Sequence, residues 1–410
     1  MREVNYGLYL HIPFCLRRCG YCDFFSSVGK RRLLPGYVRA LGDEMKMTGV
    51  AGEMPPVGSV YFGGGTPSLL DPGQPAFLLE KIRRTFRLAP DAEISIEANP
   101  GTLDGSRLQE YRKAGINRLS LGVQSADDGE LQLLGRIHSF ADAKRTCGDA
   151  RRAGWTNLSL DLIYGLPGQT PAVWERTLDR ALDFAPEHLS LYALTLERGT
   201  PLARVVRRGA IPAPDEDAAA EMYELAEEKL AVAGYRHYEI SNWARDSARG
   251  SNPDPLRSIE ERKSSFPRYA CSHNLRYWLN LPYLGLGAGA HGCAAGRRYA
   301  NIRSVEGYIE RLRTGRGRRF PLTPASTRSH IRTRDEEMRE TMWLGLRLTE
   351  AGVSREDYRS RFGEDYSDPF QKEIESSMKV GLLEWTDGER AIRLTRRGRL
   401  LGNRVFQLFV

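Results

Sequence analysis

The sequence lacks any long apolar run. Within its 410 residues, no stretch approaches the roughly 18 to 20 consecutive apolar residues that a membrane-spanning helix needs. The N-terminus also lacks an apolar segment followed by a small-residue cleavage site, which would mark a secretory signal. Internal repeats and low-complexity segments are missing as well. These absences argue against a helical membrane protein and a repeat protein, and we expect a cytoplasmic protein in a reducing compartment.

Cysteine is scarce and unevenly placed. The chain has six cysteines, and Cys15, Cys19 and Cys22 fall within eight residues in a C-x3-C-x2-C pattern. Three thiolates on one short loop can bind three irons of a four-iron cluster and leave the fourth iron open to a small molecule. A disulfide is disfavoured because three cysteines cannot all pair with one another. A zinc site, with His11 as the fourth ligand, stays open at this point.

Acidic residues are few in one region of the chain. The formal net charge is +8, and residues 297–334 carry eleven arginines but only Glu306 and Glu310 as acids. Such a stretch can meet nucleic acid, an anionic membrane surface or the carboxylates of a ligand. A solvated basic face is an equally good reading. Because no aromatic-interleaved binding motif accompanies it, we expect no nucleic-acid partner.

The first two-thirds of the sequence alternate short apolar runs with amphipathic segments. This alternation predicts right-handed βαβ units, a parallel sheet and a partial, open (β/α)6 barrel. In such folds ligands lie at the carboxyl ends of the strands. We expect strands at 7–12, 59–62, 93–98, 118–122, 157–162 and 188–194, and helices near 36–48, 75–87, 104–114, 139–153, 171–184 and 215–233.

The last third of the sequence has a different pattern. Residues 245–268 are rich in Ser, Arg, Pro and Asp, which indicates an exposed, mobile insertion. The Gly-rich run at 283–292 predicts a close backbone approach to another element or to a ligand. Helical patterns near 338–348, 354–362 and 368–381 and a small hairpin indicate a C-terminal helical, winged-helix-like domain, for which we favour docking over DNA binding. We predict domains at 1–240, 241–330 and 331–410.

Polar motifs follow the predicted strands. The run YFGGGTPS at 61–68 follows the second strand, E-x-NP the third, and GVQS the fourth. The fifth strand leads into D-x-I-x-GLPGQT at 161–170. Each motif alone is weak, and the glycines can form a plain turn. Together they predict one polar ring over one barrel mouth, which is the arrangement that a cofactor pocket needs.

His273 stands in the motif HN-x2-YW, directly after the predicted insertion. A lone histidine is more often a structural hydrogen-bonding group than a ligand. Imidazole is nevertheless a common axial ligand of haem iron, and the neighbouring aromatic rings could stack on a porphyrin. From the residues alone, both readings remain.

The ordered set of motifs resembles one family. IPFC-x3-C-x2-CDF, GGGTPS, E-x-NP, GVQS, D-x-I-x-GLPGQT, Y-x-ISN-x-A, HN-x2-YW and G-x-GAHG occur in sequence over residues 6–292. The chain resembles the HemN/HemW group, the oxygen-independent coproporphyrinogen III oxidase-like radical S-adenosylmethionine (SAM) proteins. The resemblance implies a [4Fe-4S] cluster on Cys15, Cys19 and Cys22. It also implies a SAM site formed by Tyr9, Gly64, Gly65, Thr66, Glu97, Gln124, Arg136, Asp161 and Thr195.

Within this group, the sequence departs from the dehydrogenase branch. That branch carries a further Cys two positions past the third cluster Cys, where this chain has Phe24, and a long N-terminal extension that we do not expect here. HN-x2-YW is instead similar to the HemW-type haem chaperones. That resemblance implies binding of haem, with His273 as the contact, and delivery to acceptor haemoproteins, with peripheral association at a membrane.

The same resemblance implies a reductant for the cluster and allows a homodimer, and it leaves SAM cleavage open. Two alternatives remain at this point. One is an oxygen-independent coproporphyrinogen III dehydrogenase, which oxidatively decarboxylates a porphyrin precursor. The other is a different tetrapyrrole-modifying radical SAM enzyme on the same scaffold.

Overall fold

A computed structural model of the chain describes residues 5–49, 55–246, 266–316, 318–386 and 388–410. The chain forms two compact units, the first from residues 1–226 and 282–331 and the second from residues 227–281 and 332–410. Most of the predicted insertion at 245–268 lies outside the described residues. The domain bounds predicted at 1–240, 241–330 and 331–410 remain a prediction.

The first unit is built around a parallel sheet, in which each strand pairs with the next along the chain. Six strands follow the predicted order, and the partial (β/α)6 barrel is confirmed. The strands are β1 (Tyr6–Ile12), β4 (Val57–Gly64), β5 (Leu88–Ala98), β6 (Arg118–Gln124), β7 (Leu158–Tyr164) and β8 (His188–Ala193).

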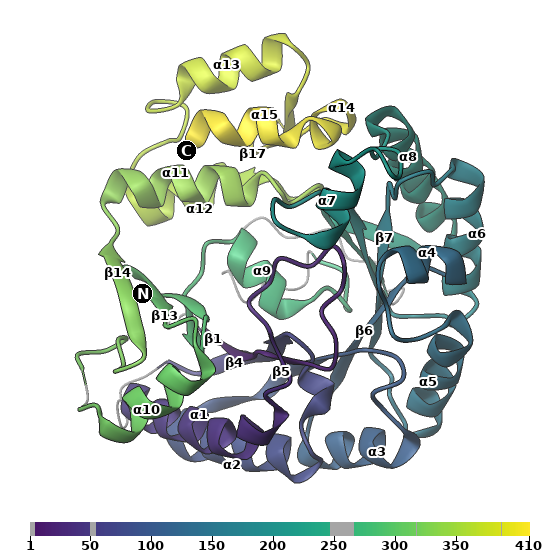
Figure 1. The fold of residues 1–410 in the computed structure, drawn as a ribbon. Coiled ribbons are helices and arrows are strands. Elements are labelled where there is room, and N and C mark those ends of the chain that lie inside the picture. The colour runs from purple at the N-terminus through teal and green to yellow at the C-terminus, as the bar shows by residue number, and fades with distance from the viewer. Residues whose placement is uncertain (1–4, 50–54, 247–265, 317, 387) are drawn as a thin grey trace. The chain divides into compact units, whose positions relative to one another are not determined.

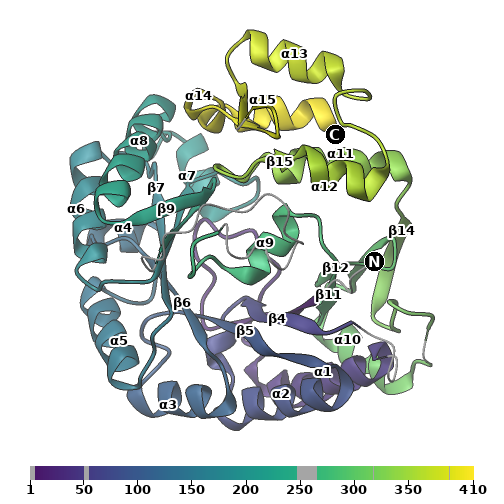
Figure 2. The same ribbon diagram turned by 180° about the vertical axis from the view of Figure 1, so that it is seen from behind.

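Helices connect these strands and cover the outside of the barrel. Figures 1 and 2 show α2, α3, α5 and α6 outside the curved strands. The helices are α1 (Leu34–Thr48), α2 (Gly73–Thr85), α3 (Gly105–Ala114), α4 (Asp128–Leu133), α5 (Phe140–Arg152), α6 (Pro171–Leu182), α7 (Pro201–Arg207) and α8 (Glu216–Val232).

Side chains at the helix starts explain where several of these helices begin. The carboxylate of Asp104 accepts a hydrogen bond from the backbone N–H of Arg107 at 2.8 Å and caps α3. Ser139 and Asp142 form a reciprocal capping box at the start of α5. Such caps satisfy backbone N–H groups that the first helical turn leaves without partners.

Polar side chains line the inside of the barrel, where they position the site. On β6, Leu119, Leu121 and Val123 are buried and alternate with the buried Arg118 and Ser120. Successive side chains of a strand point to opposite faces of the sheet. The apolar set therefore packs against the helices, and the polar set faces the inside of the barrel.

The sheet of the first unit continues past β1 with strands that the sequence patterns did not predict. β11 (Tyr283–Leu286) pairs in parallel with β1, and β12 (His291–Ala294), β13 (Arg297–Asn301) and β14 (Ser326–Ile331) follow as antiparallel neighbours. Helix α10 (Val305–Thr314) lies between β13 and β14 in the chain.

The Gly-rich run makes the close backbone approach that was expected. Gly287 has a φ of +103°, and a Cβ there would lie 2.6 Å from both the backbone oxygen of His11 and the hydroxyl of Tyr37. A side chain at this position would therefore clash with β1 and α1. The prediction of an approach to another element is confirmed.

The second unit contains a hairpin, a short helix and a winged-helix-like core, so the predicted C-terminal fold is confirmed. Met342, Tyr358, Phe370 and Ile392 are among the buried residues of this core. Its three-stranded sheet has the order β15-β17-β16. The elements are β9 (Tyr235–Glu239), β10 (Asn242–Arg245), α9 (Ser272–Trp278), α11 (Arg334–Gly345), β15 (Val353–Ser354), α12 (Arg355–Phe362), α13 (Gln371–Lys379), β16 (Leu383–Thr386), β17 (Ala391–Leu394), α14 (Arg396–Leu400) and α15 (Gly402–Phe406).

Across the described parts of both units, no helix combines the length and the apolar character that crossing a membrane would require.

Candidate functional site

The cysteine loop lies between β1 and α1 and is fastened at both ends. Cys15 ends the short strand β2 (Phe14–Cys15), which pairs with β3 (Ser27–Val28). In the middle of the loop, the N–H of Gly20 donates to the backbone oxygen of Leu134 at 2.9 Å, and its carbonyl accepts from Leu202 at 2.9 Å. The three thiol-bearing residues are half-buried. Backbone bonds therefore hold the loop both at its ends and at Gly20.

Two of the thiols accept hydrogen bonds from predicted cofactor residues. Thr66 donates from Oγ1 to the Sγ of Cys15 at 3.5 Å, and Arg136 donates from Nη1 to the Sγ of Cys19 at 3.4 Å. Burial raises the pKa of the Cys15 and Cys22 thiols above their ordinary value, and the Thr66 bond opposes this for Cys15. Donors of this kind stabilise negative charge on sulfur.

Asn99 joins these two donors to each other. Its amide Nδ2 donates to the Oγ1 of Thr66 at 3.1 Å, and its Oδ1 accepts from Nη2 of Arg136 at 2.5 Å. Cys15, Thr66, Asn99, Arg136 and Cys19 therefore form one hydrogen-bonded series. The E-x-NP pattern predicted no role for its asparagine, and only the fold brings Asn99 between the two donors.

Glycines are required at the end of β4 because the backbone there lies close to the cysteine loop. A Cβ on Gly65 would lie 2.8 Å from the backbone oxygen of Phe14 and 3.0 Å from the Sγ of Cys15. Gly64 has a φ of +115°, which side chains rarely adopt. This segment therefore presents bare backbone beside Cys15, as a ligand-binding loop requires, and leads into Thr66.

Glu97 on β5 points into the mouth and is held by two donors. Its Oε1 accepts from the hydroxyl of Tyr61 at 2.9 Å, and its Oε2 accepts from the N–H of Gly64 at 3.0 Å. Burial raises the pKa of Glu97 to about 7, the charge of Asp161 adds to the rise, and both hydrogen bonds oppose it. Tyr61, which the sequence analysis did not name as a site residue, stacks on the predicted Tyr9 with 6.3 Å between ring centroids.

Gln124 and Arg136 meet over a glycine of β6. A Cβ on Gly122 would lie 2.7 Å from Nε2 of Gln124 and 3.2 Å from Nη2 of Arg136, which itself donates to the backbone oxygen of Gly122 at 2.7 Å. Gln124 has a φ of +70°, a conformation that a residue with a side chain seldom adopts. Such outliers are enriched at ligand sites, and this one turns the end of β6 over the mouth.

Asp161 lies on β7 below this rim, in a polar layer that the sequence analysis overlooked. Both of its carboxylate oxygens accept from the hydroxyl of Ser120 at 3.1 Å. Burial raises the pKa of Asp161, and the charge of the buried Arg118 opposes the rise. Arg118 could have been recognised from the sequence, because it is a charged residue in a strand that is mostly apolar. One layer further, His188 bonds through Nδ1 to the hydroxyl of Ser159 at 2.8 Å.

Two observations leave parts of the predicted site untested. Thr195 follows β8, and its side chain is exposed. Among the described residues, no three His, Cys, Asp or Glu side chains are grouped so as to hold a metal ion. The assignment of individual cluster and SAM ligands therefore stays a prediction.

His273 lies in the second unit, on α9, and is 1% exposed. Its Nε2 is bonded to the hydroxyl of Tyr277 at 2.9 Å, and the two rings meet edge to face with 5.1 Å between centroids. Leu275 on the same helix packs in a cluster with Tyr238 and Leu348. The HN-x2-YW helix is thus a packed element of the second unit, and His273 remains a predicted haem contact.

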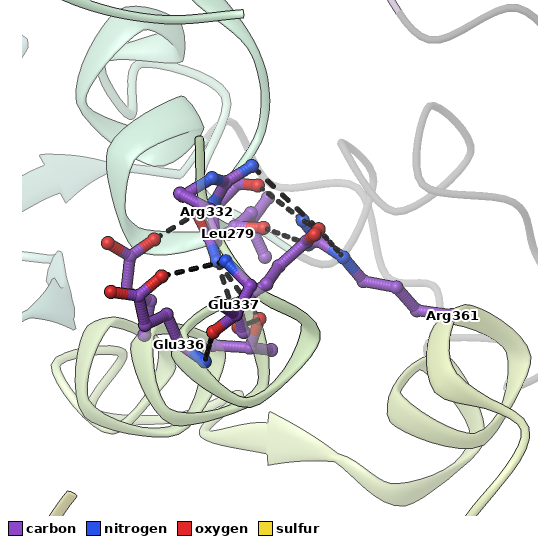
Figure 3. Close-up of polar contacts among 9 residues, drawn as sticks. Leu279, Arg332, Glu336, Glu337 and Arg361 are labelled. Atoms are coloured by element: carbon purple, nitrogen blue, oxygen red, sulfur yellow. Dashed lines mark hydrogen bonds and ion pairs between the residues drawn. The ribbon is translucent and has the colours of Figure 1, made fainter. Parts of the chain in front are cut away.

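The end of α9 is fastened by the charged network drawn in Figure 3. Arg361 donates to the backbone oxygen of Asn280 at 3.0 Å and from Nε to the carboxylate of Glu337 at 3.0 Å. Arg332 donates to the Oδ1 of Asn280 at 3.1 Å and to Glu340 at 2.9 Å. Asn280, with a φ of +49°, also donates from Nδ2 to the hydroxyl of Thr341 on α11 at 3.0 Å, so it is held from α11 and α12 together.

Comparison with known proteins matches two regions of the chain. Residues 9–181 match the radical SAM superfamily, and residues 333–401 match the HemN C-terminal domain. The structure of coproporphyrinogen III oxidase (HemN) from Escherichia coli, described as a radical SAM enzyme, superposes with a TM-score of 0.80 over 99% of this chain and 90% of its own. At 24% identity, this likeness establishes the fold.

Sequence relatives extend over nearly the whole chain. Heme chaperone HemW of Bacillus subtilis is 36% identical over 98% of both chains. Heme chaperone HemW of Mycobacterium tuberculosis H37Rv is 36% identical over 98% of this chain and 93% of its own. The chain belongs to the HemW family.

The relatives of this chain include proteins from animals as well as from bacteria. The mouse mitochondrial radical S-adenosyl methionine domain-containing protein 1 is 39% identical over 92% of this chain and 81% of its own. The radical SAM region within HemW implies a [4Fe-4S] cluster and SAM. The mouth described above fits both groups, because it combines three half-buried cysteines, bare glycine backbone and a ring of buried polar side chains.

Proposed function

We propose that this protein binds haem and delivers it to acceptor haemoproteins. The observation that carries the proposal is the 36% identity over 98% of both chains with a heme chaperone, HemW of Bacillus subtilis. Phe24 supports it, because the dehydrogenase branch places a further cysteine at this position. Phe24 is 66% exposed and offers an apolar ring, not a thiol, beside the cysteine loop.

Cys15, Cys19 and Cys22 would hold the [4Fe-4S] cluster through three of its irons. The open iron would bind the amino and carboxylate groups of SAM, and the reduced cluster would supply the electron for any SAM cleavage. Thr66 and Arg136, which already donate to two of the thiols, would continue to donate to the thiolates.

The other predicted SAM residues would orient and enclose the cofactor. Glu97 would accept a hydrogen bond from a ribose hydroxyl or from the ammonium group of SAM. Its carboxylate is already held in place by the hydroxyl of Tyr61 and the backbone N–H of Gly64. Tyr9, Gly65, Gln124 and Asp161 would line the rest of the pocket. Thr195, being exposed, would have to close over the cofactor from the loop after β8.

His273 is the sequence-based candidate for the haem contact. Its ring is buried and its Nε2 is bonded to Tyr277, so ligation of iron through that nitrogen requires this bond to open. The proposed delivery further implies a reductant for the cluster and an acceptor that can lie at a membrane. It is compatible with a homodimer.

The experiment is a haem titration of the anaerobically reconstituted full chain, followed by absorbance, with wild type compared to His273→Ala. Asn280→Ala serves as a packing control, because Asn280 lies two residues past the end of the same helix and has no imidazole. The same preparation is assayed with coproporphyrinogen III, SAM and reductant.

Stoichiometric haem binding and transfer to an acceptor apoprotein, without vinyl product, would support the proposal. Vinyl product without stable haem binding would replace it with a coproporphyrinogen dehydrogenase. Methylated or ring-opened haem would replace it with a different tetrapyrrole-modifying enzyme. A spectrum altered in His273→Ala but not in Asn280→Ala would assign the contact to that imidazole.

A further inference from the structure

Asn99 follows β5 at the barrel mouth, and its backbone is bonded on both sides. Its N–H donates to the Oγ of Ser68 at 3.4 Å, and its carbonyl oxygen accepts from the Oγ1 of Thr102 at 2.6 Å. Ser68 and Thr102 are also bonded to each other at 2.6 Å. Pro100 comes next, and a proline favours an extended conformation of the residue before it. The backbone of Asn99 is therefore fixed, and its side chain starts from a defined point.

The orientation of the Asn99 amide follows from the chemistry of its two partners. Its Oδ1 lies 2.5 Å from Nη2 of Arg136, and the oxygen must face the guanidinium because that group has only donors. The amide nitrogen then faces the Oγ1 of Thr66 at 3.1 Å and donates to it. An amide turned the other way would place its N–H donors against those of Arg136. Only one orientation therefore satisfies both partners.

This orientation directs the hydroxyl of Thr66 toward sulfur. A hydroxyl has a single proton and two acceptor lone pairs. Asn99 donates to the oxygen of Thr66, so the Thr66 proton can be donated to the Sγ of Cys15, which lies at 3.5 Å. Hydrogen bonds in such a series polarise one another, so the amide strengthens the bond to sulfur. Asn99 therefore acts on Cys15 through Thr66.

Asn99 directs the guanidinium of Arg136 in a similar way. Nη2 of Arg136 is bonded to the Oδ1 of Asn99 and, at 2.7 Å, to the backbone oxygen of Gly122. Because Nη2 is held from two sides, Nη1 is placed to donate to the Sγ of Cys19 at 3.4 Å. Cys19, Thr66, Asn99 and Arg136 also line one small cavity. The side chains of this series therefore face the same space as the thiol of Cys19.

We infer that Asn99 is a positioning residue for the [4Fe-4S] cluster, which it makes easier to reduce by directing Thr66 toward Cys15 and Arg136 toward Cys19. This inference rests on the proposed function, since it needs the cluster that the three cysteines would hold. Reduction adds one electron, and so one negative charge, to the cluster. Hydrogen bonds donated to the ligand sulfurs stabilise that charge and are among the factors that set the potential of such clusters.

The test is a redox titration with dithionite, followed by EPR, on the full chain reconstituted anaerobically with iron and sulfide and without SAM or haem. Wild type is compared with Asn99→Ala, which removes both side-chain bonds, and with Asn99→Asp, which keeps the shape. In Asn99→Asp one oxygen still accepts from Arg136, but the other accepts the Thr66 proton and draws it away from Cys15. The matched control is Asn157→Ala, a half-buried asparagine directly before β7, at the opposite end of that strand from the mouth.

Both variants of Asn99 should lower the midpoint potential of the cluster. Asn99→Ala should reduce the equilibrium constant for one-electron reduction roughly fivefold, which is about 40 mV. Asn99→Asp should reduce it roughly tenfold or more, about 60 mV, because it also adds a negative charge near the cluster. Asn157→Ala should keep the wild-type potential. A residue that only supported the fold would change the amount of cluster in the preparation, but not the potential of the clusters that remain.

A comparison of two backgrounds tests whether Asn99 acts through its two partners. Thr66→Val removes the hydroxyl and keeps the shape of the side chain, and Arg136→Gln removes the guanidinium. Residues that act through one another show effects that do not add. Asn99→Ala should therefore shift the potential no further when it is introduced into T66V/R136Q. If Asn99→Ala holds no cluster, Asn99→Asp decides alone in both backgrounds.

Wild-type potentials in both Asn99→Ala and Asn99→Asp would overturn the inference and leave the proposed function intact. An equal shift from Asn99→Ala in wild type and in T66V/R136Q would do the same, since Asn99 would then act without Thr66 and Arg136. A wild-type chain that holds no cluster would overturn the cluster assignment and the inference together. The expected potentials in a chain that binds no haem would support the inference and overturn only the delivery of haem.

Discussion

The guanidinium of Arg136 donates a hydrogen bond to the thiol sulfur of Cys19 over 3.4 Å. The two residues lie 117 positions apart in the chain. The contact forms because the loop after α4 folds back over the carboxyl ends of β5 and β6. A cation at this distance favours negative charge on the sulfur.

Arg136→Gln should make the cluster harder to reduce. Loss of the positive charge beside Cys19 should lower its midpoint potential by roughly 60 mV, which is a tenfold change for one electron. An EPR-monitored redox titration measures this. Arg145→Gln, an exposed arginine paired with Asp142 on α5, is the control and should leave the potential unchanged. Equal potentials in all three proteins would show that Arg136 does not act on the cluster.

Glu97 should make the stability of the SAM-free protein depend on pH. Its pKa is raised to about 7 from 4.5, so the folded state holds a proton that the unfolded state releases over this range. The contribution of Glu97 to stability should therefore be full at and below about pH 4.5 and be lost as pH rises through 7, by about 3 kcal/mol at most.

Glu97→Gln should remove that loss, because an amide does not ionise. Urea unfolding at pH 5 and pH 8 measures the difference, and the variant should gain on wild type at the higher pH. Glu110→Gln, an exposed carboxylate paired with Lys113, is the control. If Glu97→Gln destabilised the protein equally at pH 5 and at pH 8, Glu97 would be ionised in the folded protein at both pH values.

Glu44 on α1 should be a major source of stability for the sheet extension β11–β14. It is fully buried and accepts from Gly287, Asn301, Tyr308 and Thr323 at 2.6 to 2.8 Å. Glu44→Ala would leave these donors without their acceptor, so we expect a loss of about 3 kcal/mol or more. Chemical denaturation compares it with Asp43→Ala, its exposed neighbour, which should cost little. Similar midpoints for both variants would contradict the assignment.

Arg361 should control the local opening of the HN-x2-YW helix. Its bonds to Asn280 and Glu337 fasten the end of α9 to α11 (Figure 3). Arg361→Ala should therefore raise amide hydrogen exchange across 272–281 by roughly tenfold, since partly buried charged hydrogen bonds contribute about 1.5 kcal/mol or more. Lys372→Ala, at an exposed position of α13, is the control. Unchanged exchange in Arg361→Ala would show that apolar packing alone holds the helix.

Local patterns were enough to predict the barrel and the polar ring. The alternation of apolar runs with amphipathic segments is a short-range feature, so β1, β4 to β8 and their helices could be predicted from the sequence. The approximate place of Glu97 and Asp161 followed, because parallel strands bring their carboxyl ends to one edge. The short antiparallel strands β11–β14 carry no comparable periodicity, and they were missed.

The spacing of Cys15, Cys19 and Cys22 and the order of the motifs by themselves determined the family and the chemistry to be expected at the barrel mouth. Only the tertiary structure decided which side chains meet there. Asn99 joins Thr66 to Arg136 because three separate loops converge on one point. It also decided that His273 is buried on α9 and bonded to Tyr277. Burial and cross-strand register depend on contacts between distant parts of the chain, so no local sequence pattern determines them.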